Sequence, residues 1–196
     1  MIRTAYIQKQ ILNIFRHVDS ITFPIVPENL LPLLSFPCRF LSYTEAAQVI
    51  GCTVDAIYRM CGSSSGATQY QPNANRCLIF YNNSQPDGRV LWTKAHELGH
   101  VMLGHIHMMG GRHCHYDLLE READFFAWNL LAPMPLMREF GIQNPKQVQR
   151  VFGLSKQAAD LCFQRYVRWE RSHIKTAWEN DLIHTYRHKQ IKAGAS

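Results

Sequence analysis

Apolar side chains recur at intervals of three and four residues along much of the chain. This is the period of one helix face, and it predicts a mainly helical protein. Near the N-terminus, the apolar positions with this spacing are Ile7, Ile11, Ile14, Phe15 and Val18. We therefore expect an amphipathic helix over residues 3–18.

Prolines at positions 24, 27, 32 and 37 interrupt the apolar stretch that follows. Proline lacks the backbone N–H that a helix interior needs, so this density favours short elements and turns over one long helix. The stretch is too apolar for a solvated linker. We expect it to wrap against the core.

Two short helices are predicted next. Thr44 and Thr53 stand where helix N-caps belong, and Gly51 and Gly62 stand where the same helices would end.

Residues 76–82, RCLIFYN, are the best strand candidate in the chain, because β-branched and aromatic residues are concentrated there. The sequence PNAN at 72–75 supplies a hairpin turn before it.

Two strong helices follow. The first is predicted to begin between Arg89 and Thr93 and to carry the sequence KAHELGHVML. Asp117 is the expected cap of the second, LLEREADFFAWNLLA, which Pro133 and Pro135 would end.

Further helices are predicted in the C-terminal quarter. Asn144 opens a short helix that Gly153 ends, and Ser155 caps a longer one over residues 156–178. Residues 189–196 are expected to fray.

Composition supports a globular protein. The chain of 196 residues is 46% hydrophobic and 18% charged, which excludes a disordered chain and suits one domain, or one domain with an appendage. The formal net charge of +6 permits a nucleic-acid partner but does not require one. Histidine is the unusual residue, because six of the ten lie between positions 96 and 115.

The N-terminus lacks the continuous apolar segment of a secretion signal, and no run approaches the ~18 apolar residues of a membrane span. The six cysteines are dispersed without a CxxC pair. We therefore expect a cytoplasmic protein with reduced thiols and no structural zinc ribbon.

The sequence HELGH at 96–100 is an HExxH motif. Helical residues four apart differ by about 40° in azimuth, so His96 and His100 would project from one helix face. Two neutral imidazoles there can bind one metal ion, and Glu97 beside them can act as general base on a water. The motif predicts a catalytic site for one zinc ion.

A catalytic zinc ion usually has three protein ligands and a water, and three origins for the third ligand compete. His105 is the nearest candidate, but it lies about 180° from His96 if the helix continues. His107, His113 and His115, in the loop after the helix, could fold back or contact substrate. The third origin is the acidic segment farther along the chain.

Glu120 and Asp124 are four residues apart, so they share one face of the second strong helix. On this interpretation Glu120 binds the metal, and Asp124 accepts a hydrogen bond from a ligand imidazole. Glu122 would then point about 160° away, toward solvent, although it stays an alternative ligand.

The sequences WTKAHELGHVMLGH and EREADFFAWNLLAP together resemble the ImmA/IrrE family of metallo-endopeptidases. Its members pair HELGH with a downstream glutamate in an ExEAxxFAxxLLxP-like signature. The resemblance extends from about Phe40 to Pro133. It implies an α+β fold, mainly helical with a small three-stranded sheet, in which a gluzincin-like zinc peptidase core precedes C-terminal helices.

For the site, the resemblance implies one Zn²⁺ bound by His96, His100 and Glu120. It also implies that Glu97 assists the attack of water on a peptide bond. The implied partner is a regulatory protein, typically a helix-turn-helix repressor that controls a mobile element or a stress response. The protein would then act in transcription regulation without contacting a membrane.

Two features of substrate binding stay open from the residues. Tyr116, His113, His115 and Arg89 are all candidates for contacting substrate or for stabilising the oxyanion. If the strand over residues 77–82 lies at a sheet edge, an extended substrate could pair with its backbone.

We expect a metallopeptidase domain over residues 1–141, with an N-terminal helix and wrapping segment at 1–39 and a core at 40–141. Residues 142–196 would form a C-terminal helical region with a helix-turn-helix-like cadence.

The alternative function is a DNA- or protein-binding regulatory module with a vestigial or structural metal site. Basic residues near the last predicted helix that could contact phosphates are Arg165, Arg168, Arg171 and Lys175. Apolar residues such as Ala159 and Leu161 favour packing or substrate docking for this region over direct nucleic-acid binding.

Overall fold

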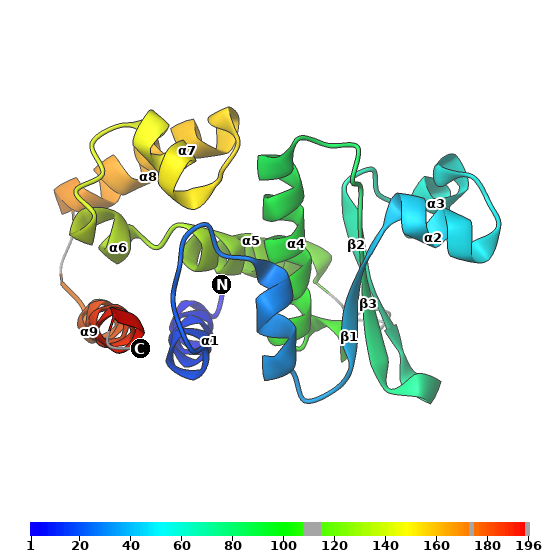
Figure 1. Ribbon diagram of the computed structural model, residues 1–196, viewed down its shortest axis with the longest axis horizontal. Helices are drawn as coiled ribbons and strands as arrows, with labels where there is room; N and C mark the ends of the chain where they lie inside the picture. The colour runs from blue at the N-terminus through cyan, green and yellow to red at the C-terminus, as the bar shows by residue number, and fades with distance from the viewer. Residues whose placement is uncertain (108–114, 173–174, 195–196) are drawn as a thin grey trace.

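The computed structural model describes residues 1–107, 115–172 and 175–194 (Figure 1). It shows a mainly helical α+β protein with a small three-stranded sheet, so the predicted fold class is confirmed. Two long helices, α4 (Asp87–Met102) and α5 (Tyr116–Leu131), form its centre. In Figure 1 they lie between the sheet and the C-terminal helices.

The sheet has the strand order β1–β3–β2. The central strand β3 (Arg76–Tyr81) pairs in parallel with β1 (Cys38–Ser42) and antiparallel with β2 (Gly66–Gln71). The short helix η2 (Pro72–Ala74) makes the turn between β2 and β3. Both the strand and the turn were predicted from the sequence and are confirmed.

The condition that β3 lies at a sheet edge is not met, because β3 pairs with β1 on one side and with β2 on the other. Its two faces are also covered: Cys77 and Ile79 belong to the main core, whereas Phe80 and Leu78 pack in a second, smaller apolar cluster. Within the described part of the chain, β1 and β2 are the outer strands.

Helix α4 packs against β2 and β3. The short helices α2 (Tyr43–Ile50) and α3 (Val54–Cys61) lie beyond the sheet, on its other side (Figure 1). Thr53 caps α3, as predicted, but the predicted cap at Thr44 is wrong. Helix α2 begins two residues earlier, with Ser42 as its cap. The Ser42 hydroxyl accepts from the Glu45 backbone N–H, and the Glu45 carboxylate accepts from the Ser42 backbone N–H.

The segment before β1 packs around the outside of the core. Helix α1 (Thr4–His17) occupies the predicted residues and packs against α5. The proline-rich segment contains η1 (Pro27–Leu33) and buries Ile21, Ile25 and Leu30 in the main core. The prediction that this segment wraps against the core is therefore confirmed.

Helix α5 begins at Tyr116, so Asp117 lies in its first turn and is not its cap. An acidic side chain in the first turn still stabilises the positive end of the helix dipole.

The described residues after α5 form four further helices: α6 (Met134–Glu139), α7 (Pro145–Phe152), α8 (Lys156–Ser172) and α9 (Ala177–Gly194). The predicted C-terminal boundary of the helix over residues 156–178 is wrong, because α8 ends at Ser172.

Helix α9 includes residues that were expected to fray. It packs against α1, where the Trp178 indole N–H donates to the Gln8 carbonyl at 2.9 Å. The main core also continues past position 141, because Val148, Phe152 and Leu182 belong to it. None of the described helices is long and apolar enough to cross a membrane.

The two central helices approach each other closely at Gly99. A Cβ atom at this position would lie 3.0 Å from Cδ1 of Phe126 and 3.4 Å from Cα of Ala123. Both partners are fully buried, so neither can turn into solvent to make room. The absence of a side chain at Gly99 therefore sets the spacing between α4 and α5.

We expect Gly99→Leu to lower the free energy of unfolding by about 1–3 kcal/mol, because overpacking forces the two helices apart. Urea denaturation followed by circular dichroism measures this change. Arg121→Leu is the control, because it adds the same side chain at an exposed position of α5. Equal stability of the two variants would contradict the importance of this contact.

Candidate metal centre

The central helices bring together His96 and His100 from α4 and Glu120 from α5. One potential ligand atom from each lies within 4.8 Å of the others. Nε2 of His96 is 3.1 Å from Nε2 of His100 and 3.2 Å from Oε2 of Glu120. The His100 side chain is 2% exposed and that of Glu120 is 55% exposed, so the cluster opens toward solvent on the glutamate side.

The second ring nitrogen of His96 faces α5. Its Nδ1 lies 3.0 Å from Oδ1 of Asp124, which is one turn after Glu120. Because a carboxylate only accepts hydrogen bonds, Nδ1 carries the proton in this pair. In the neutral imidazole that binds a metal, the lone pair of Nε2 is then directed into the cluster.

The second ring nitrogen of His100 faces the buried interior of the protein. Its Nδ1 lies 3.1 Å from Nδ1 of His105, and Nε2 of His105 lies 3.1 Å from Oε2 of Glu122. The side chains of His105 and Glu122 are 0% and 1% exposed. His105 follows α4 in the short helix η3 (His105–His107), so the helix does not continue through it.

The expectation that Glu122 points toward solvent is wrong. Arg3, at the start of α1, encloses this carboxylate: its backbone N–H donates at 2.7 Å, and its guanidinium donates from Nε and Nη2 at 2.9 and 2.6 Å. Helical spacing correctly predicted that Glu122 points away from Glu120. It could not show that α1 and η3 cover the opposite face.

Together these contacts form a chain from Arg3 through Glu122 and His105 to His100. If Nε2 of His105 donates to Glu122, then Nδ1 of His105 is an acceptor and takes the Nδ1 proton of His100. Nε2 of His100 is then free to bind a metal. Asp124 and His105 thus support the same tautomer in the two clustered histidines, although one support is exposed and the other buried.

The pKa values of the two clustered histidines depend on these surroundings. Burial opposes protonation of His96, but the hydrogen bonds to Asp124 and Glu120 outweigh it and raise its pKa to about 10. Burial and the neighbouring His96 lower the pKa of His100 to about 4. Without a metal, His96 is therefore protonated near neutral pH, whereas His100 is neutral.

The carboxylate of Glu97 is held beside this cluster by the sheet. Thr68, on the edge strand β2, donates its hydroxyl to Oε2 of Glu97 at 2.8 Å. Burial raises the pKa of Glu97, while His96 and the Thr68 hydrogen bond oppose that rise. A carboxyl group whose pKa lies above its usual range is better matched to proton transfer near neutral pH.

The other predicted site residues occupy different surroundings. The His107 ring packs edge-on against Tyr70 and Phe36, and Arg89 donates to the Ser65 hydroxyl at 3.3 Å. His115 and Tyr116 are exposed at the start of α5. His113 lies outside the described residues.

Sequence reasoning missed Arg3 and Thr68 as partners of the site. Both lie far from the motifs along the chain, on α1 and β2, and neither belongs to a recognisable spacing. Local sequence carried no signal for them, because only the packing of distant elements brings them to Glu122 and Glu97.

The helices α7 and α8 have the predicted helix-turn-helix cadence, with Asn144 capping the first and Ser155 accepting from the Ala158 N–H at the start of the second. However, residues of both helices belong to the main core, among them Phe152 and Cys162. The Arg165 guanidinium lies over the Trp128 ring at 5.1 Å.

Comparison with known families places the site within a matched domain. The family Peptidase M78, described as the IrrE N-terminal-like domain, matches residues 54–162, which is more than half of the chain. This range contains the metal cluster, Glu97 and most of the sheet. No match was found among curated proteins.

We expect Arg3→Ala to lower the free energy of unfolding by about 3 kcal/mol, because it leaves the buried Glu122 carboxylate without its cationic partner. Denaturation of the metal-free protein measures the loss. The double variant Arg3→Ala/Glu122→Gln should recover part of it, since the uncompensated charge is gone. If the double variant were less stable than Arg3→Ala by the full cost of Glu122→Gln, the two side chains would not be coupled.

Proposed function

The chain belongs to the Peptidase M78 family of IrrE N-terminal-like domains, a family of metallopeptidases, and we propose that it is a zinc-dependent endopeptidase that cleaves a regulatory protein. The observation that carries the proposal is the convergence of two histidine Nε2 atoms and one carboxylate beside Glu97.

The donor set fits zinc. Two imidazoles and one carboxylate are a known combination in catalytic zinc sites, where the fourth position stays open for water. His96, His100 and Glu120 would hold the ion, and the exposure of Glu120 leaves a path for water and substrate. When bound, zinc supplies a more acidic water and a Lewis acid for the scissile carbonyl.

Glu97 performs the proton transfers. Its carboxylate accepts a proton from the attacking water and then delivers it to the nitrogen of the leaving amine. The Thr68 hydroxyl occupies one carboxylate oxygen, so it orients the group and leaves the other oxygen for the water. Asp124 and His105 keep the two imidazoles oriented during this cycle.

The free edge of β2 offers a binding position for the substrate. β2 carries Thr68, so a peptide that pairs with this edge lies next to Glu97. Edge-strand pairing fixes the register of an extended segment through backbone hydrogen bonds. This replaces β3 as the strand that receives the substrate.

We propose a helix-turn-helix repressor as the substrate, which the resemblance to ImmA/IrrE proteins supports. The protein would then act in the cytoplasm, on a regulator of a mobile element or stress response. We further propose that residues 1–141 perform the chemistry and that 142–196 take part in selecting the substrate.

Glu97→Gln tests the base. The variant should bind zinc with the same stoichiometry, but cleavage should fall by about 10²–10⁴-fold because the proton acceptor is gone. Zinc content is measured by atomic emission. Cleavage is measured by mass spectrometry after incubation with repressors encoded beside the gene. Wild-type cleavage rates in this variant would refute the mechanism.

A pair of matched variants tests the third ligand. Glu120→Gln should lose stoichiometric zinc, because the amide is a much poorer ligand than the carboxylate. Glu122→Gln should still bind one zinc ion, with affinity reduced about 10–100-fold because it acts on His100 only through His105. Competition with a chromophoric chelator measures both affinities. The opposite ranking would assign the ligand to Glu122.

A further inference from the structure

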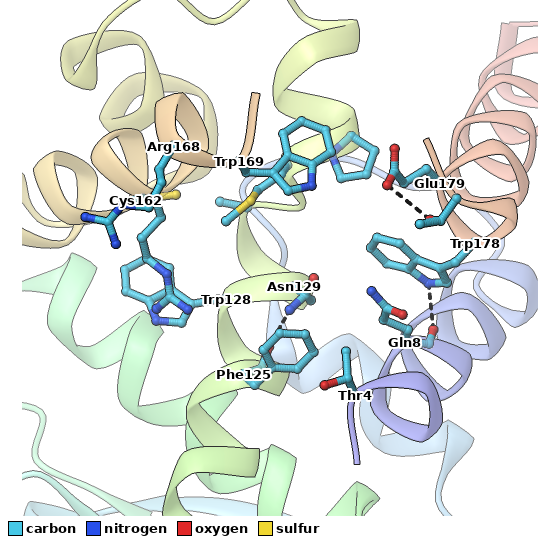
Figure 2. A pocket seen from close by; sticks show the side chains of 15 residues that line it. Thr4, Gln8, Phe125, Trp128, Asn129, Cys162, Arg168, Trp169, Trp178 and Glu179 are labelled. Carbon is cyan, nitrogen blue, oxygen red and sulfur yellow. Dashed lines mark hydrogen bonds between the residues drawn. The ribbon is translucent and has the colours of Figure 1, made fainter. Parts of the chain in front are cut away.

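A cavity lies beside helix α5, at a different place from the metal cluster. It has a volume of about 500 Å³ and lies among α1, α5, α6, α8 and α9 (Figure 2). None of the three clustered metal-site residues lines it. Its size is within the range of small-molecule sites, about 300–1,000 Å³.

Aromatic side chains dominate its walls. Three of the four tryptophans of the chain, Trp128, Trp169 and Trp178, surround the space in Figure 2, and Phe125 joins them. All four side chains are only partly buried. Leaving so much aromatic surface around an open space forgoes hydrophobic stabilisation, which a bound planar ring would recover.

Polar and charged side chains also line the cavity, and they differ in exposure. Arg165 and Arg168, both exposed residues of α8, line the cavity. The one acidic lining residue, Glu179, is buried and accepts from the Thr176 hydroxyl at 3.0 Å. Asn129 lies between the tryptophans and donates its amide to the Phe125 carbonyl at 2.7 Å.

These groups are complementary to one kind of ligand. Indole rings bind planar rings by stacking, and guanidinium groups bind carboxylates or phosphates through paired hydrogen bonds. Both arginines are exposed, and the Arg165 guanidinium lies over the Trp128 ring at 5.1 Å, so the charged end of the ligand would face solvent. We propose that this cavity is a binding site for a small aromatic anion.

The position of the cavity relates it to the metal cluster without overlap. Helix α5 carries Glu120 and Asp124 at the metal cluster, and Phe125, Trp128 and Asn129, farther along the same helix, line the cavity. Trp128 also packs against Trp92 of α4, with ring centroids 4.3 Å apart. A ligand in the cavity therefore contacts a helix that carries part of the proposed active site.

The test uses metal-free full-length protein, so it does not depend on the proposed zinc chemistry. Naphthalene-2-carboxylate is the anionic probe, and naphthalene-2-methanol is its neutral counterpart. Isothermal titration calorimetry should show one site for the carboxylate, with at least tenfold higher affinity than for the alcohol. The carboxylate should quench tryptophan fluorescence and raise the melting temperature, because it binds only the folded state.

Two substitutions locate the site. Arg165→Gln should weaken binding of the carboxylate at least fivefold and leave binding of the alcohol unchanged. Arg150→Gln is the matched control, because Arg150 is an exposed arginine on α7 that does not line the cavity. Trp169→Leu should weaken both probes. The melting temperature of each free variant shows that it is folded.

Three outcomes would overturn the proposal: no saturable binding of the carboxylate, equal affinity for the two probes, or equal effects of Arg165→Gln and Arg150→Gln. If instead a peptide that carries no aromatic anion displaced the probe and bound more tightly, the cavity would be a polypeptide docking site, and the proposed ligand class would be wrong.

Discussion

The close approach of α4 and α5 is the constraint on which the rest of the structure depends. It is possible because Gly99 has no side chain and faces Ala123 and Phe126. Gly99 belongs to the HELGH motif and Ala123 to the EREAD segment. These two small residues therefore set the distance between the histidines of α4 and Glu120 of α5. A wider spacing between α4 and α5 would preserve the fold class, but it would separate Glu120 from the histidines.

The two clustered histidines are supported in different ways. His96 relies on the exposed Asp124, from the same helix that carries Glu120. His100 relies on His105, Glu122 and finally Arg3, a buried chain that ends on α1. The first helix is therefore part of the site's architecture, because an unpaired Glu122 carboxylate would be costly to bury. Stability of the core and orientation of His100 depend on the same ion pair.

Each central element serves two purposes. Edge strand β2 orients Glu97 through Thr68 and is also the strand on which we propose that a substrate pairs. Helix α5 contributes to the metal cluster near its start and to an aromatic cavity farther along. This arrangement follows from its central position, since its 16 residues pack against both α4 and α1.

The sequence by itself determined the helical periodicity, most of the caps and the shared helix face of His96 and His100. These features depend on residues within one or two helical turns, and the 3.6-residue period fixes their relative directions. That Glu120 meets the two histidines depends on how α5 packs against α4. Only the tertiary structure decided that β3 is central, that α9 continues through the expected frayed end, and that Glu122 is buried against Arg3. Helical spacing gives the direction of a side chain about its own axis, whereas the neighbour it meets depends on how distant elements pack.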